Sequence, residues 1–131
     1  MKEKYEVHDI IIAIGTNTRQ KENLQKAKTM LCRKFGDARF SSALWTQPID
    51  IKSEVFLNAL ASAKTSLSRD ETTAALKEME KACGNTRALR DEGIIVTDLD
   101  LMAYDNEKLH IADWERPYIK ALAKELNDNN K

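Results

Sequence analysis

The stretch Val96-Thr97-Asp98-Leu99-Asp100-Leu101-Met102-Ala103-Tyr104 places two acidic residues inside an otherwise apolar run. A β-branched start, alternating leucines and an aromatic end are typical of a buried β-strand. Successive side chains of a strand point to opposite faces, so Asp98 and Asp100 share a face, with their Cα atoms about 6–7 Å apart. Two carboxylates at this spacing can bind one hard cation.

The two aspartates allow two interpretations. Buried without a counter-charge, they would cost free energy or take up a proton. Magnesium resolves this conflict, because it accepts one or two carboxylates and completes its octahedral shell with water and phosphate oxygens. The pair therefore predicts a nucleotide-metal site. The alternative is the solvated face of an edge strand, with Leu99 and Leu101 turned into the core, since half-buried antiparallel strands show the same alternation.

The length and composition predict a single domain over residues 1–131. A chain of 131 residues can bury one core but is short for two ordinary domains. The Asn- and Asp-rich tail from about residue 127 is expected to be disordered.

The charge and hydropathy patterns exclude several classes of partner. The chain has 21 basic and 21 acidic residues, which argues against a nucleic-acid-binding protein. The longest apolar run, residues 10–14, is far shorter than a membrane-spanning helix, and the start of the chain is not a secretory signal. We therefore expect a cytoplasmic protein with no membrane partner. Cys32 and Cys83 lack metal-ligand spacing and are expected to be reduced thiols.

The order of the strand-like and helix-like segments predicts an α+β fold. Strands are expected over residues 8–14, 39–44, 55–63 and 96–104, and helices over residues 24–35 and from the capping box of Ser68 and Glu71 to Gly84. The order βαββαβ is typical of a ferredoxin-like fold, an antiparallel sheet with helices on one face. An extra C-terminal helix is expected to begin around Pro117, with an apolar stripe of Ile119, Leu122, Ala123 and Leu126.

Four short motifs occur in the order and near the spacing of one enzyme family. Ala13-Ile14-Gly15-Thr16-Asn17 is similar to an A-I-G-S-N opening, and Phe56-Leu57-Asn58-Ala59 to a Y-L-N-A strand. Ser41-Ser42 followed by Thr46-Gln47-Pro48-Ile49 is similar to S-S-x-x-x-T-x-P, and Asp98-Leu99-Asp100-Leu101-Met102 to a D-L-D-I/L-M metal motif. Together they resemble the 6-hydroxymethyl-7,8-dihydropterin pyrophosphokinase family over most of the chain, from about Ile10 to Leu122.

The resemblance implies a diphosphotransferase of folate biosynthesis that moves pyrophosphate from ATP to 6-hydroxymethyl-7,8-dihydropterin, giving AMP and the pterin diphosphate. It implies that Asp98 and Asp100 are catalytic and hold two Mg²⁺ ions, with ATP as co-substrate. These small molecules would be the partners of a monomer or weak dimer. The implied pterin-binding residues are Thr46, Gln47, Ile49, Phe56, Asn58 and Tyr118, and the implied ATP-binding residues are Glu80, Arg87, His110 and Arg116.

Several of these residues also have an ordinary structural interpretation. Phe56 and Tyr118 are equally typical of a hydrophobic core, and Arg87 and Arg116 of a solvated surface. His110 is also compatible with a structural or exposed position. Asn58 is harder to explain structurally, because an amide within an apolar strand needs hydrogen-bond partners.

The chain departs from the family pattern after the second predicted helix. Asn85 and Ile95 stand where arginines are expected, and Glu92 where a tryptophan is expected. The connection from Asp100 to His110 is also shorter than in the family. Arg90 lies in the same loop and could compensate by reaching inward.

Three functions therefore remain open. The first is an active pyrophosphokinase, and the second is a pterin- or nucleotide-binding relative with impaired catalysis, since phosphoryl transfer depends on charge stabilisation. The third is a ferredoxin-like domain that binds another protein through an open sheet face.

Overall fold

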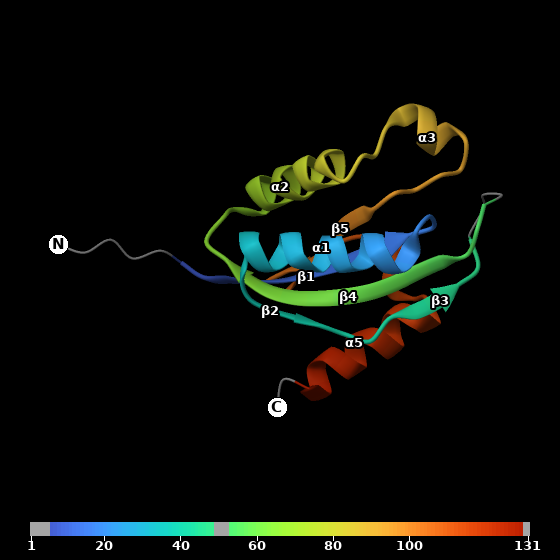
Figure 1. The fold of residues 1–131 in the computed structure, drawn as a ribbon. Helices are drawn as coiled ribbons and strands as arrows, with labels where there is room; N and C mark the ends of the chain where they lie inside the picture. The colour runs from blue at the N-terminus through green and yellow to red at the C-terminus, as the bar shows by residue number, and fades with distance from the viewer. Residues whose placement is uncertain (1–5, 49–52, 130–131) are drawn as a thin grey trace.

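The computed structural model describes residues 6–48 and 53–129 and shows one antiparallel sheet with helices on both of its faces (Figure 1). Within these residues the sheet has six strands in the order β2-β4-β1-β5-β6, and β3 also pairs with β4. The elements are β1 His8–Thr16, α1 Gln20–Lys34, β2 Gly36–Phe40, β3 Leu44–Thr46, β4 Phe56–Thr65, α2 Arg69–Ala82, α3 Arg87–Asp91, β5 Asp98–Tyr104, β6 Glu107–Lys108, α4 Ile111–Trp114 and α5 Pro117–Asn129.

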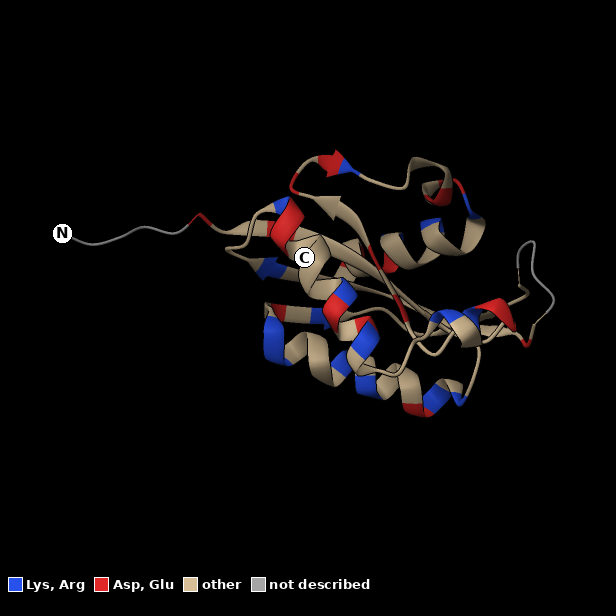
Figure 2. Ribbon diagram, turned by 90° about the horizontal axis from the view of Figure 1, so that it is seen from above, with Lys and Arg blue, Asp and Glu red and all other residues tan. Residues whose placement is uncertain are grey.

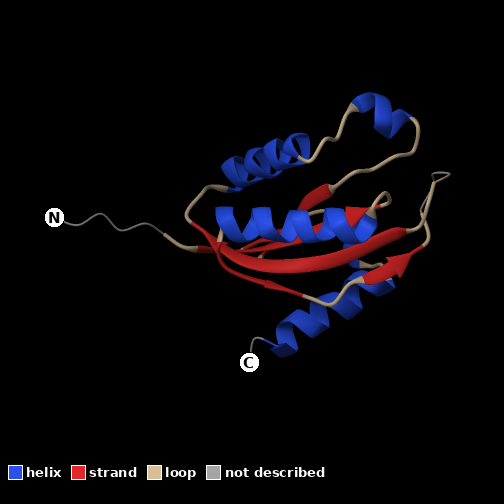
Figure 3. Cartoon of the chain, viewed as in Figure 1, coloured by secondary structure: helices blue, strands red, loops and turns tan. Residues whose placement is uncertain are grey.

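The helices lie in two layers. α1 and α2 cover one face of the sheet, and α5 lies against the other (Figure 3). This arrangement confirms the predicted α+β, ferredoxin-like fold with a C-terminal helix, and it shows that the additional helix lies opposite the first two. The third hypothesis needs an open sheet face, but α5 packs on that face against Leu60 and Met102.

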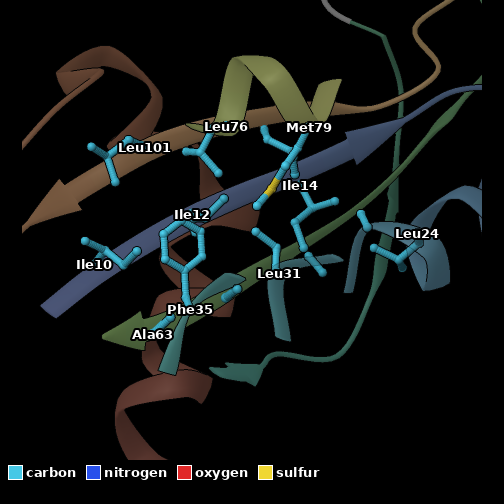
Figure 4. Close-up of a cluster of buried hydrophobic side chains, with 14 of the residues drawn as sticks. Ile10, Ile12, Ile14, Leu24, Leu31, Phe35, Ala63, Leu76, Met79 and Leu101 are labelled. Carbon is cyan, nitrogen blue, oxygen red and sulfur yellow. The ribbon is translucent and has the colours of Figure 1, made fainter. Parts of the chain in front are cut away.

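The main core lies between the sheet and the helices α1 and α2. Ile10, Ile12 and Ile14 of β1 are each at most 1% exposed and lie among side chains from both helices, including Leu31 and Met79 (Figure 4). Burying one such side chain contributes about 1.5–3 kcal/mol. The intervening residues of β1 point to the α5 side, as expected from the alternation of a strand.

The strand predicted over residues 39–44 is two strands. Ser41 still pairs with β4, because its backbone N–H donates to the Leu60 carbonyl and its hydroxyl accepts from the Leu60 N–H, both at 2.9 Å. Ser42 leaves the ladder, since its N–H and its hydroxyl donate to the Glu125 carboxylate of α5, at 2.6 and 2.7 Å. This latch between a loop and a distant helix could not be read from local sequence.

The other predicted elements form with shifted ends. The capping box of Ser68 and Glu71 is confirmed at the start of α2. Residues 127–129 were expected to be disordered, but α5 continues through them. The reason is that Leu126 is buried against the sheet and holds the last turns of the helix in place. None of the helices within the described ranges is long and apolar enough to cross a membrane.

Candidate functional site

The floor of the candidate site is formed by two rows of residues across three strands. In the first row, Gly15 of β1 lies between Asn58 of β4 and Asp98 of β5. In the second, Ala13 lies between Leu60 and Asp100. Because Gly15 and Ala13 are small, the polar side chains of Asn58, Asp98 and Asp100 stand around a hollow.

A cavity of about 310 Å³ opens over this floor, next to the start of α5. It combines apolar and aromatic walls with a few polar groups, which is typical of a small-molecule site. Its lining includes Ala13, Gly15, Thr46, Gln47, Phe56, Asn58, Arg90, Ile95, Asp98, Asp100, Met102, Asp113, Arg116, Tyr118 and Ile119.

The amide of Asn58 is oriented by the neighbouring strand β3. Its Nδ2 donates to Thr46 Oγ1 at 2.7 Å and to the Leu44 carbonyl at 3.3 Å. Its Oδ1 lies beside Gly15, where an added Cβ would be only 3.2 Å away. No residue in the described ranges donates to Oδ1, so this oxygen is left to accept a hydrogen bond from a ligand in the cavity.

The carboxylates of Asp98 and Asp100 are half-buried and border the cavity, a position that favours the metal-site interpretation over a solvated face. Asp98 Oδ1 accepts from Arg90 Nη2 at 2.7 Å. Burial raises the pKa of Asp100, and the negative charge of Asp98 raises it further. Leu99 and Leu101 point to the opposite face and belong to the main core.

Glu80 of α2 closes the edge of the sheet beside the two aspartates. β6 pairs only with Ala103 and Tyr104, so the first half of β5 has a strand neighbour on one side alone. There the Leu99 N–H donates to Glu80 Oε2 at 2.7 Å. Burial raises the pKa of Glu80, although this hydrogen bond lowers it.

A shallower groove of about 700 Å³ lies on the other side of the aspartates. Asp98, Asp100 and Arg90 line both hollows, so the carboxylates stand between an aromatic cavity and a groove lined by four basic and four acidic side chains. Elsewhere, basic and acidic residues are interspersed along the ribbon in Figure 2, in agreement with the balanced composition. The lining of the groove also includes Lys77, Glu80, Lys81, Asn85, Thr86, Arg87 and Asp91.

Comparison with known proteins gives two matches. The model of the 7,8-dihydro-6-hydroxymethylpterin-pyrophosphokinase family matches residues 11–127. The chain belongs to this family. The mitochondrial folate synthesis bifunctional protein of Pisum sativum is 33% identical over 129 residues, which cover 90% of the chain and 25% of that relative. The chain thus spans about a quarter of the length of this relative.

The pyrophosphokinase residues predicted from the motifs fall into three groups. The cavity brings together Thr46, Gln47, Phe56, Asn58, Asp98, Asp100, Arg116 and Tyr118. Glu80 and Arg87 line the groove instead. His110 lines a third hollow of about 400 Å³, which it shares with Asp100 and Lys77. Ile49 lies outside the described residues.

The two positions where this chain lacks an arginine of the family pattern have structural roles. The Asn85 amide forms two hydrogen bonds with the backbone of Thr97: it accepts from the N–H at 3.0 Å and donates to the carbonyl. Ile95 is 4% exposed, and its N–H donates to Asn17 Oδ1 at 2.7 Å. These two asparagines fix both ends of the segment that carries α3. Glu92, in place of the expected tryptophan, is exposed at the end of α3.

Asp113 is a charged residue of the cavity that no motif of the sequence indicates. Asp113 lines the cavity and accepts from Arg116 Nε at 3.0 Å. Its separation of three residues from Arg116 is compatible with an ordinary helical ion pair, so its place in the site depends on how α4 packs near the sheet.

The donor set fits magnesium, as the family implies. No group of three or more His, Cys, Asp or Glu side chains able to hold a metal occurs in the part of the chain that the structure describes. A bound ion would rest on Asp98 and Asp100 and take its remaining ligands from water or phosphate, as Mg²⁺ commonly does. Burial and the negative charge of Asp98 raise the pKa of Asp100, and a bound cation would stabilise its charged form.

Proposed function

We propose that the chain catalyses magnesium-dependent transfer of pyrophosphate from ATP to 6-hydroxymethyl-7,8-dihydropterin, giving AMP and the pterin diphosphate. The observation that carries this proposal is the position of Asp98 and Asp100 between the aromatic cavity and a groove that also holds four basic side chains. A flat acceptor in the cavity and a triphosphate in the groove would meet at these carboxylates. The hydroxymethyl oxygen then bonds to the β-phosphorus and loses its proton, while the bond from the β-phosphorus to the AMP oxygen breaks.

The cavity offers a pterin ring both stacking and edge contacts. Phe56 and Tyr118 border it, and stacking on such rings contributes about 1 kcal/mol. The free Oδ1 of Asn58 can accept from a ring N–H, while Thr46 holds the amide in this orientation. Gln47 provides a further polar wall next to Thr46.

The phosphates would contact basic side chains from three places in the chain. Arg87 lines the groove, Arg116 lines the cavity, and His110 lies beyond Asp100. Glu80 would act by fixing the backbone between the aspartates through the Leu99 N–H. Magnesium, when bound, supplies charge that offsets the negative charge on the phosphoryl oxygens.

We further propose that this activity belongs to a single domain over residues 1–131, working as a monomer or weak dimer. A cytoplasmic location stays a prediction from the sequence.

The direct test is to incubate the protein with ATP, Mg²⁺ and 6-hydroxymethyl-7,8-dihydropterin and to measure AMP. Asp98→Asn should abolish AMP formation while the circular dichroism spectrum and the Tm stay close to those of the wild type. Asp128→Asn is the matched control, because Asp128 lies on the exposed side of α5, where it pairs with Lys124. Equal rates for Asp98→Asn and the wild type would refute the proposal.

A binding protein without turnover is the second candidate. It is favoured by the structural use of Asn85 and Ile95, which leaves the phosphate side with fewer cations than the family pattern expects. In this case calorimetry would detect binding of the pterin or of a non-hydrolysable nucleotide, while no AMP accumulates over a long incubation. Sustained AMP formation by the wild type would exclude it.

A further inference from the structure

Arg90 occupies a central place that the family motifs do not assign. It comes from α3, yet it lines both the aromatic cavity and the groove on the other side of the aspartates. Its Nη2 donates to Asp98 Oδ1 at 2.7 Å, so the guanidinium forms an ion pair with one of the two carboxylates that would hold the metal.

The other arginines around the site are differently placed. Arg116 pairs with Asp113, three residues away in the same segment. Arg87 lines the groove but not the cavity. Among the described residues, Arg90 is the cation that forms an ion pair with either Asp98 or Asp100.

The ion pair of Arg90 is suited to exchange. The Arg90 side chain is 51% exposed and that of Asp98 31%, and half-exposed pairs of this kind are weak. α3 buries none of its own residues, so its packing does not lock Arg90 in place. A divalent ion would compete with the guanidinium for the same Asp98 oxygen, whereas phosphate oxygens arriving in the groove would offer Arg90 a planar, bidentate partner.

We propose that Arg90 changes partner during the reaction. In the free protein it neutralises Asp98. When metal and nucleotide bind, it moves to a phosphate oxygen and supplies positive charge that Asn85 and Ile95 do not provide. This inference rests on the proposed function, and it makes Arg90 a catalytic residue.

The first measurement is metal binding without nucleotide, with Mn²⁺ as the probe and calorimetry as the readout. Arg90→Met should bind Mn²⁺ about threefold to fivefold more tightly than the wild type, since a weak competing ion pair is removed. Arg90→Lys should stay near the wild type because it keeps the charge. Arg33→Met removes an exposed arginine from the last turn of α1 and should leave the affinity unchanged.

The second measurement is the affinity for nucleotide, which should fall in the variant whose Mn²⁺ affinity rises. Arg90→Met should bind α,β-methylene-ATP with Mg²⁺ about tenfold more weakly than the wild type, because one cation that contacts the phosphates is lost. With ATP as the substrate, it should form AMP about 100-fold more slowly. Arg90→Lys should recover part of both. Tighter metal binding together with weaker nucleotide binding cannot come from misfolding, which would lower both affinities.

Two results would overturn the inference. One is an Arg90→Met variant that binds Mn²⁺ no more tightly than the wild type, and the other is an unchanged affinity for the nucleotide analogue. If the wild type forms no AMP, the proposed function fails by itself, while the two binding measurements still decide whether Arg90 exchanges partners. If Arg90→Met does not fold, Arg90→Gln provides the same comparison with a smaller neutral side chain.

Discussion

The two faces of β5 carry side chains of opposite character. On one face, Leu99 and Leu101 are at most 4% exposed and pack under α1 and α2. On the other, Asp98 and Asp100 are half-buried and border the cavity. Successive side chains of β5 point to opposite faces, so neighbouring residues alternate between stabilising the core and lining the cavity.

The central strand β1 shows the same division with different residues. Ile12 and Ile14 fill the core, whereas Ala13 and Gly15 leave space above the sheet. The chemistry on the second face thus depends on small residues as well as acidic ones. The comparison predicts that substitutions on the two faces have separable effects on activity and stability.

Among the three substitutions that compare the two faces, Asp100→Asn is expected to have the largest effect. It should lower the rate of AMP formation about 1,000-fold, equivalent to about 4 kcal/mol of transition-state stabilisation, because the acid that would hold the metal is lost. The Tm should not fall, since burial and Asp98 already disfavour the charged form of Asp100 and raise its pKa. Steady-state kinetics and thermal melts measure the two effects.

A large loss of stability in Asp100→Asn would break the comparison, because it would make the cavity face part of the structural core. The wild-type protein with excess EDTA provides a control without substitution: it should lose activity to a similar degree while its Tm stays the same.

Leu99→Ala should show the reverse behaviour. Truncating this buried side chain should lower the free energy of unfolding by about 3 kcal/mol, through lost burial and the cavity left behind. The kcat below the melting transition should change less than threefold, because the backbone N–H that donates to Glu80 is retained. Urea unfolding followed by circular dichroism gives the free energy, and a loss of kcat without a loss of stability would contradict the division between the faces.

Gly15→Ala should have the smallest effect. The new methyl group would lie 3.2 Å from Asn58 Oδ1 and 3.7 Å from the Phe56 ring, so the site must shift slightly to admit it. We expect the KM for the pterin to rise about tenfold, which corresponds to about 1.4 kcal/mol, with kcat changing less.

Gly36→Ala is the matched control for this substitution. Its added Cβ would meet only the Lys64 carbonyl, at an ordinary 3.7 Å, on a different part of the sheet. The KM of this variant should equal that of the wild type. Similar KM values for the Gly15 and Gly36 variants would show that the cavity floor does not contact the pterin.

The residues that could be predicted were those with a local signature. The alternation of Asp98 and Asp100 with leucines placed both acids on one face, and the capping box marked the start of α2. Arg90 was recognised only as a residue that could reach inward, because no local pattern states where the loop lies. The latch between Ser42 and Glu125 was missed for the same reason, since the two residues are 83 positions apart.

The sequence by itself determined the order of the main strands and helices, the apolar face of the main strands, and the motifs of the pyrophosphokinase family. These depend on periodicity and on residue types close together in the chain. Only the tertiary structure decided that α5 covers the second face, that Asp113 lines the cavity, and that Arg90 rests on Asp98. Such placements depend on how distant segments pack, and packing is set by the whole core rather than by any local stretch.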